Sequence, residues 1–573
     1  MRSSYVLRLC VIITALLGWT LSTLYWANAQ PDTAVHLVGH IDPRHGISYN
    51  GTYYSSCWGW VAPDGREYAL LGAADGTSII DLNRDSLVEV GFIPGPPSGY
   101  AYREIKTYKH YAYVVSEGGS GVQIIDLAGL PDSAVLVKSF IYVSTTPPDS
   151  GKSIDRSHTV TIADGYLYCN GSAHWSPNGS IIFSLREDPV NPIFMETYEP
   201  MYIHDSYVRH DTLFGAAIYN GGGLFIADVS DKSIPLTIGK ISYSGSGTHN
   251  AWVSINGAYA FTTDEVNQTA HDMKVWDLHG LPNSVMVAEW SADPTTSIHN
   301  VHGRGNYVYV AHYKAGMRVV DVHDPTNPVE AGSYDTYTPE PDPVGGPYAG
   351  CWGVYPYFPS GKWIGSDMQT GLYVCTFDSL KPRKRPRLLD PPDSSLYRTV
   401  TTFRWTSVAN QAEDPHVYDL HLVGQGMDTT VTTSDTTAEI QSTAFQPEWY
   451  TWDVTVRDEF TEVSSVDTFR FYQIVESVGK ENGRPARYSL KQNYPNPFNP
   501  LTKIVFELPA SSHTTLEIYD LSGRRVAILL NGTLLPAGKQ EVVFDATTLP
   551  SGTYFYRLKT GTFSETKKML LAR

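Results

Sequence analysis

Short runs of alternating apolar and polar residues, separated by turns rich in Gly, Pro and Asp, cover most of the chain after its first thirty residues. Alternation of this kind in segments rich in Val, Ile, Tyr and Thr predicts β-strands. Seven of the runs share one pattern, a leading small or polar residue, an apolar stretch and a closing Asp or equivalent. They are GTSIIDL (76–82), GVQIIDL (121–127), GSIIFSL (179–185), GLFIADV (223–229), DMKVWDL (272–278), GMRVVDV (316–322) and GLYVCTF (371–377).

The shared pattern recurs at a spacing of about 50 residues, and most copies follow a second strand-like run such as YAYVVSE. Four short strands per repeat at this period are typical of a β-propeller, because a single small sheet cannot bury both of its faces alone. We therefore predict an all-β chain with a seven-bladed propeller over residues 34–380. An array of β-sandwiches is the alternative, although sandwich strands would not repeat one element in this way.

The length and net charge of the chain narrow the range of functions it can have. A chain of 573 residues exceeds one ordinary domain, and its net charge of −17 argues against a nucleic-acid partner. Residues 1–29 carry two arginines, an apolar run and an A-x-A cleavage pattern, which predicts a signal peptide rather than a retained anchor. No other run approaches the ~20 apolar residues of a membrane span, so no retained span is expected.

The segments GMRVVDVHDPTNPVEAGSY and GVQIIDL resemble LVIVD repeats. The whole predicted propeller is similar to that of the choice-of-anchor B family of secreted bacterial proteins, whose members carry different C-terminal anchoring or sorting modules. The resemblance implies a propeller and export, and it implies no defined reaction.

Aligning the repeats on their shared strand identifies one ring position at the start of each first strand. Since the first strand of a blade lines the channel, this position is expected at one channel mouth. Around the ring it is held by Cys57, Arg103, His158, His204, His249, His299 and Cys351. The second strand returns to the same mouth, and its end offers Asp75, Glu117, His174, Asn220, Asp264, Glu265, His312 and Asp367.

Three interpretations of the repeated histidine stay open. Each ring nitrogen can bond the next blade and fasten neighbouring blades together. The imidazoles His158, His204, His249 and His299 can bind a divalent metal ion, since neutral imidazoles and carboxylates suit Zn, Cu, Ni or Fe. A histidine with an acidic partner can also serve as the general base of a hydrolase or lyase, although the sequence contains neither G-x-S-x-G nor H-E-x-x-H.

Cys57 and Cys351 share the pattern Cys-Trp-Gly and lie in the first and last repeats, which meet when the ring closes. The sequence leaves open a disulfide between them, two buried thiols, or metal ligation.

After the propeller, residues 381–388 are predicted to be a linker, residues 389–474 a fibronectin type III or immunoglobulin-like sandwich, and residues 475–487 a second linker. The sandwich is expected to act as a spacer.

Residues 488–573 carry several short motifs in a fixed order, among them NYPNPFNP, YDLSGR and LPSG. In this order they resemble the type A sorting domain of the type IX secretion system, which implies a small β-sandwich read by the outer-membrane translocon. The prolines are expected to hold an extended entry strand. The matching residues are Asn493, Tyr494, Pro495, Asn496, Pro497, Phe498, Asn499, Pro500, Gly523, Gly538 and Gly552.

The sequence therefore predicts a bacterial protein that is exported through the periplasm, sorted by the type IX translocon, and secreted or held at the outer cell surface. Its propeller is expected to bind an unknown extracellular ligand or protein. A metal-dependent hydrolase or lyase with its site at the channel mouth is the alternative.

Overall fold

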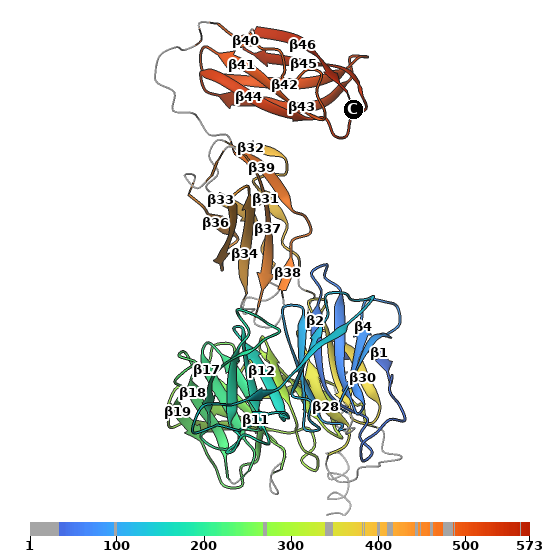
Figure 1. The fold of residues 1–573 in the computed structure, drawn as a ribbon, viewed down its shortest axis with the longest axis vertical. Coiled ribbons are helices and arrows are strands. Elements are labelled where there is room, and N and C mark those ends of the chain that lie inside the picture. The colour runs from blue at the N-terminus through green and yellow to red at the C-terminus, as the bar shows by residue number, and fades with distance from the viewer. Residues whose placement is uncertain are drawn as a thin grey trace, which may run out of the picture. The chain divides into compact units, whose positions relative to one another are not determined.

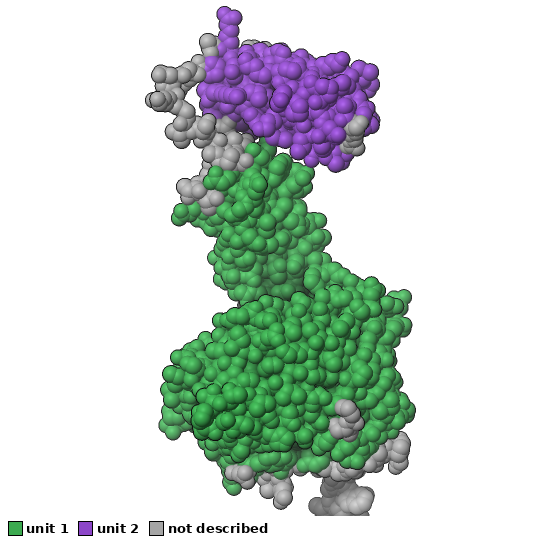
Figure 2. Space-filling view, viewed as in Figure 1, with its two compact units in different colours: residues 1–475 green, residues 476–573 purple. Residues whose placement is uncertain are grey.

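The computed structural model describes residues 34–96, 100–219, 221–266, 272–337, 348–380, 382, 384–397, 402–408, 416–441, 445–446, 448–458, 462–473, 485, 487–561 and 563–572. The predicted signal peptide lies outside these residues. Every regular element within them is a β-strand, and this part of the chain holds no helix long and apolar enough to cross a bilayer. The chain divides into two compact units, residues 1–475 and 476–573, which are coloured separately in Figure 2.

Seven four-stranded antiparallel sheets form a β-propeller, each corresponding to one predicted repeat (Figure 1). The innermost strands β2, β6, β12, β16, β20, β24 and β28 contact one another in sequence, and β28 contacts β2, so the ring is closed.

The first three sheets are β2 (Tyr54–Val61), β3 (Glu67–Ala73), β4 (Gly76–Asp81) and β5 (Val88–Pro94); β6 (Arg103–Tyr108), β7 (Tyr111–Ser116), β8 (Val122–Asp126) and β9 (Val135–Phe140); and β12 (Thr159–Ala163), β13 (Tyr166–Asn170), β14 (Ser180–Ser184) and β15 (Ile193–Tyr198). The next three are β16 (Asp205–Arg209), β17 (Thr212–Ala217), β18 (Gly223–Asp228) and β19 (Leu236–Ile241); β20 (Thr248–Val253), β21 (Tyr259–Asp264), β22 (Met273–Asp277) and β23 (Val285–Trp290); and β24 (Val301–Arg304), β25 (Tyr307–His312), β26 (Gly316–Asp321) and β27 (Val329–Tyr334). A small additional sheet, β10 (Tyr142–Val143) and β11 (Ser153–Ile154), lies in the connection before β12.

The seventh sheet is completed by the start of the chain. Strands β28 (Cys351–Tyr355), β29 (Lys362–Asp367) and β30 (Gly371–Phe377) supply its inner three positions. Its outer strand is β1 (Val35–Ile41), which pairs antiparallel with β30 from Val35 opposite Phe377 to Ile41 opposite Leu372. Hydrogen bonds between the two ends of the propeller sequence therefore hold the ring shut.

The repeated glycine of the third strand has a steric cause. Gly223 has a φ of +81°, and a Cβ atom there would lie 2.1 Å from the carbonyl oxygen of Ile241. At Gly371 the φ is +101°, and a Cβ atom would lie 2.4 Å from the carbonyl oxygen of Ile41. At both positions the fourth strand leaves room only for a residue without a side chain.

The repeated aspartate at the end of the third strand caps the turn that follows it. Its Oδ1 atom accepts a hydrogen bond from the backbone N–H two residues later, which fixes an Asx turn. This bond measures 2.8–2.9 Å at Asp81, Asp126, Asp228, Asp277 and Asp321.

Apolar side chains from facing sheets fill the space between blades. Trp363 of β29 and Tyr309 of β25, for example, are both fully buried and meet edge to face with ring centroids 5.0 Å apart. Burying such large rings supplies much of the stabilisation of a propeller, because no single sheet has a core of its own.

The second module of the first unit has two sheets that share one core around Trp405 and Trp452. One sheet consists of β31 (Leu388–Asp390), β33 (Thr402–Trp405) and β36 (Thr437–Glu439). The other consists of β32 (Ser395–Tyr397), β39 (Phe469–Gln473), β37 (Trp449–Arg457), β34 (Val417–Gly424) and β35 (Met427–Thr433), with β38 (Glu462–Ser464) paired to β37. Its assignment as a fibronectin type III-like spacer stays a prediction.

The second unit is a sandwich of a three-stranded and a four-stranded sheet. The strands are β40 (Ser489–Leu490), β41 (Leu501–Leu508) and β44 (Gly538–Asp545), and β43 (Arg525–Leu535), β42 (Ser512–Asp520), β45 (Gly552–Thr560) and β46 (Phe563–Leu571). The expected entry strand across the prolines is wrong. Residues 494–500 form bends with isolated bridges, because proline has no N–H with which to continue a ladder.

Candidate metal centre

The four repeated histidines occupy equivalent places in four successive blades. His158 directly precedes β12 and His204 directly precedes β16, while His249 is the second residue of β20 and His299 stands two residues before β24. The predicted ring position therefore places all four at the entrances of innermost strands.

The four imidazoles form a continuous arc of neighbouring rings. Ring centroids are 3.8 Å apart between His158 and His204, 4.6 Å between His204 and His249, and 4.0 Å between His249 and His299. The arc continues to Trp352, whose ring lies 4.1 Å from that of His299. Aromatic packing alone accounts for these ring contacts, so the contacts do not by themselves indicate a bound ligand.

Three of the rings have their Nδ1 atom held by a neighbour. His158 Nδ1 lies 2.6 Å from Glu117 Oε1, and His204 Nδ1 lies 3.1 Å from the hydroxyl of Tyr202. His249 Nδ1 donates to the backbone carbonyl of His299 at 3.0 Å. Metal-binding histidines typically donate one ring N–H to a carboxylate, carbonyl or hydroxyl in this way, which leaves the other nitrogen for the ion.

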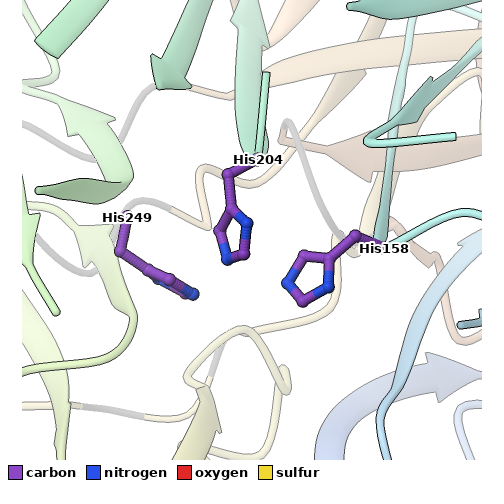
Figure 3. A group of neighbouring side chains, drawn as sticks. All are labelled: His158, His204 and His249. Atoms are coloured by element: carbon purple, nitrogen blue, oxygen red, sulfur yellow. The ribbon is translucent and has the colours of Figure 1, made fainter. Parts of the chain in front are cut away.

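The remaining nitrogens of these three rings point toward one another (Figure 3). One nitrogen from each of His158, His204 and His249 lies within 4.8 Å of the other two. His249 Nε2 is buried, and no hydrogen-bond partner for it exists among the described residues. Two ligands on one tetrahedral ion with ordinary metal–nitrogen bonds stand about 3.3 Å apart, so modest side-chain rotation brings the three rings onto an ion.

The fourth histidine belongs to a second group. His299 lies with His249 and Glu265, and one potential ligand atom from each of these residues is within 4.8 Å of the others. That all four imidazoles bind one ion therefore stays a prediction. They form two overlapping groups, and His249 is the member common to both.

Burial sets the protonation of most of these rings. It lowers the pKa of His204 and His299 well below the ordinary value and also lowers that of His249, so the three imidazoles are neutral at neutral pH. Burial also opposes the charge of His158, but the hydrogen bond and the charge of Glu117 outweigh it and raise the pKa of His158. His158 in turn lowers the pKa of Glu117, although the burial of Glu117 acts in the opposite direction.

Among the acidic and basic residues predicted around the mouth, Glu117 and Glu265 lie beside histidines of the arc. Asp75 pairs with Arg44. Asp264 accepts from the N–H of Gly247 at 3.1 Å and pairs with Lys274 at 3.0 Å, so its sequence neighbour Glu265 faces the histidines instead. The sequence predicted both of these adjacent acids at the strand end, and the structure places Glu265 beside His249 and His299.

Of the other predicted mouth residues, Asn220 lies outside the described residues, and those below have structural partners. Arg103 is buried and donates from Nε to the carbonyl of Ala73 at 2.7 Å. His312 Nε2 bonds the carbonyl of Thr296 at 3.0 Å, and burial lowers its pKa to about 4. Asp367 accepts from the N–H groups that follow it and from the hydroxyl of Thr336 at 2.8 Å.

The four cysteines of the described residues, Cys57, Cys169, Cys351 and Cys375, are all buried free thiols. The disulfide that the sequence left open between Cys57 and Cys351 is not formed. These two residues lie on β2 and β28, which belong to separate sheets that meet through side chains rather than through a hydrogen-bonded ladder.

Residues that the sequence did not single out complete the site. Tyr202 holds His204, Tyr313 donates from its hydroxyl to Glu265 Oε1 at 2.5 Å, and Trp352 packs on His299. Tyr202 stands two residues before the repeated histidine, but nothing in its local pattern distinguishes it from the many other tyrosines of the chain.

Comparisons with known proteins identify two segments of the propeller and most of the C-terminal unit. Residues 492–572 match the family described as the secretion system C-terminal sorting domain. Residues 218–242 and 298–336 match the LVIVD repeat. No curated protein matches the chain. A solved structure of a protein from Lactobacillus plantarum, a structural genomics target, is similar with a TM-score of 0.39 at 12% identity, covering 56% of this chain and 90% of that chain.

The matches confirm the LVIVD repeats and the sorting domain, whereas the choice-of-anchor B name is not confirmed. A sorting domain of this family marks proteins that type IX secretion exports to the cell surface or the medium, so the C-terminal segment is the part handled by that machinery. The chain is accordingly an exported β-propeller protein with a type IX sorting tail.

Proposed function

We propose that this exported protein binds a divalent transition-metal ion at one mouth of its propeller, through His158, His204 and His249. The observation that carries the proposal is the shared arrangement of the three rings. Each has its Nδ1 held by a neighbour, and one nitrogen of each lies within 4.8 Å of the other two.

The chemistry of the donors favours a transition metal over calcium or magnesium. Imidazole nitrogen suits Zn, Cu, Ni, Co and Fe, whereas Ca and Mg prefer oxygen ligands. Burial keeps His204 and His249 neutral, which is the form that binds a metal ion.

A purely structural role accounts for the site less well. The bond from His249 Nδ1 to the carbonyl of His299 does fasten two neighbouring blades. It leaves His249 Nε2 buried without a partner, which ordinarily costs about 1–3 kcal/mol. An ion bound there offsets that cost.

At the cell surface or in the medium, a metal-bearing mouth would serve the propeller as a binding module for an extracellular ligand. A metal-dependent hydrolase or lyase would use the same ion. Turnover of a substrate by the metal-loaded protein would distinguish such an enzyme from a binding protein.

The test is metal analysis of the purified exported chain. After removal of metal by a chelator and reloading with Zn²⁺, elemental analysis is expected to find bound metal in the wild type and none in His204→Ala or His249→Ala. His174→Ala is the matched control, because this exposed histidine bonds Asp155 and belongs to neither group. A wild-type protein that retains no Zn²⁺, Co²⁺, Ni²⁺ or Cu²⁺ would contradict the proposal.

A further inference from the structure

His249 belongs to both histidine groups but has only one nitrogen to offer. Its Nδ1 atom is committed to the carbonyl of His299, so Nε2 is its single available ligand atom. One nitrogen lone pair binds one ion. The two groups therefore surround a common ion position rather than two separate sites.

Glu265 is held firmly beside that position. Its backbone N–H donates to the carbonyl of Gly247 at 3.1 Å, and its own carbonyl accepts from the hydroxyl of Ser297 at 2.8 Å. Its side chain is only 15% exposed. Oε1 accepts from Tyr313, which leaves Oε2 directed toward His249 Nε2 at 3.6 Å.

The charge of Glu265 is not balanced by a permanent cation. Within the described residues, its ion-pair neighbours are the imidazoles of His249 and His299, at 3.6 Å and 4.0 Å. Burial disfavours the charged form of both rings. A carboxylate removed from water is ordinarily paired with a cation or coordinates a metal, and here no arginine or lysine among those residues supplies the pairing.

We propose that the mouth takes a single ion and that Glu265 Oε2 is its carboxylate ligand beside the imidazoles of His158, His204 and His249. This inference rests on the proposed function. Two ligands of one ion stand about 3.0–3.4 Å apart, so the pair of Glu265 Oε2 and His249 Nε2, at 3.6 Å, needs an adjustment of a few tenths of an ångström. Glu265 does not form a group with His158 and His204, so its carboxylate must rotate further to approach these two rings.

A set of three nitrogens and one oxygen selects among metals. It suits Zn²⁺, Co²⁺, Ni²⁺, Mn²⁺ and Fe²⁺, and it lacks the thiolate or thioether that favours Cu⁺. The carboxylate reduces the net charge of the site to +1, and any open coordination position would then attract anionic or neutral oxygen donors. Tyr313 acts as a positioning residue, because its bond to Oε1 leaves Oε2 as the single oxygen for the ion.

The experiment uses the full exported chain reconstituted with Co²⁺, whose visible absorption reports the number and type of ligands. Titration is expected to saturate at one Co²⁺ per chain. Glu265→Gln keeps an acceptor for Tyr313, so it is expected to fold, to bind Co²⁺ at least about tenfold more weakly and to show a changed spectrum. Tyr313→Phe is expected to weaken binding by a smaller factor. Glu330→Gln, which removes a carboxylate from the outer strand of blade six, is expected to match the wild type.

The outcomes separate the two proposals. If His204→Ala loses the metal while Glu265→Gln keeps the wild-type affinity and spectrum, the carboxylate ligand is overturned and the histidine site stands. Saturation at two ions per chain would also overturn the inference. A wild-type protein that binds no metal would contradict both proposals. Thermal melts of each variant without metal identify any that fails to fold, and for such a variant Glu265→Asp provides the same comparison.

Discussion

The Nδ1 atom of His249 donates a hydrogen bond to the backbone carbonyl of His299, 3.0 Å away across the boundary between two blades. This contact joins the fifth blade to the sixth, as does the bond from Thr263 Oγ1 to the same carbonyl at 2.8 Å, and it also fixes which nitrogen of His249 faces the mouth. Because the acceptor is main chain, substitution of the His299 side chain leaves the contact in place, whereas substitution of His249 removes both this contact and the ligand.

Metal should stabilise the propeller through His249. In the wild type, Zn²⁺ at 100 times its dissociation constant is expected to raise the free energy of unfolding by about 2.7 kcal/mol. His249→Ala should lose this increment, because the site loses the nitrogen common to both groups. Differential scanning calorimetry with and without Zn²⁺ measures the effect, with His174→Ala as the control. If Zn²⁺ raised the free energy of unfolding of His249→Ala by the same amount, the ion would have to bind elsewhere.

Tyr202 should tune the affinity of the site without binding the ion. Tyr202→Phe removes the hydroxyl that lies 3.1 Å from His204 Nδ1 and leaves the ring packing intact. Loss of an outer contact of this kind typically weakens metal binding about 10- to 100-fold. Isothermal titration calorimetry checks the prediction. Tyr219→Phe is the matched control, since Tyr219 packs near the same imidazole only through its ring.

The metal-free propeller should lose stability as the pH falls through the range below 6.5. Burial lowers the folded pKa of His204, His249 and His299 below the ordinary histidine value of about 6.5, so the unfolded chain binds more protons in this range. Each such ring contributes up to about 1.4 kcal/mol per pH unit to the loss. Urea denaturation at pH 7.5, 6.5 and 5.5 measures it, and His204→Gln should give a shallower dependence.

His158 should act in the opposite sense. Its folded pKa is raised, so its bond to Glu117 contributes stability that is fully present below 6.5 and is lost as the pH rises through the folded pKa. Glu117→Gln is therefore expected to destabilise the protein more at pH 5.5 than at pH 8. An equal effect at both values would show that the pair does not carry the charge assigned to it.

The glycine that opens the third strand should not tolerate a side chain. Gly223→Ala is expected to destabilise the propeller by about 1–3 kcal/mol, since the new Cβ meets the carbonyl oxygen of Ile241 at 2.1 Å. Gly65→Ala is the matched control, because Gly65 has a similar φ of +88° and nothing within 4 Å of the added atom. Chemical denaturation of both variants separates the steric clash from the cost of the backbone conformation alone.

The cysteines should be unreactive until the protein unfolds. Burial raises the pKa of Cys57 and Cys375 to about 12, so almost no thiolate forms at pH 8. A thiol reagent is expected to label no cysteine of residues 34–573 in the native protein and all four in denaturant. Labelling of only two in denaturant would reveal a disulfide in the exported protein.

The sequence predicted the sheets well because the repeated residues act locally. The leading glycine and the closing aspartate each make a contact within one blade, such as the Asx turn at Asp228, so the same chemistry recurs in most repeats. The pairing of β1 with β30 had no such signal. Nothing in the segment 35–41 indicates a partner more than 330 residues away.

The division of the histidines into two groups was also beyond the sequence. It depends on the register of individual strands. The pairing of β20 with β21 shifts between Thr248 and Asn250, so His249 lies in an irregular step of the ladder that re-aims its side chain. Asp264 and Glu265 are adjacent acids, and Asp264 is engaged by Tyr243, Gly247 and Lys274, so that Glu265 is the one facing the histidines.

The pairing of β1 with β30 also sets the order in which the propeller can be completed. The outer position of the last blade is filled by the first strand to be synthesised, and that strand has no partner until residues 371–377 exist. Ring closure therefore depends on contacts between residues that lie very far apart in the sequence. Such contacts slow folding, and the propeller is completed only when its whole sequence is available.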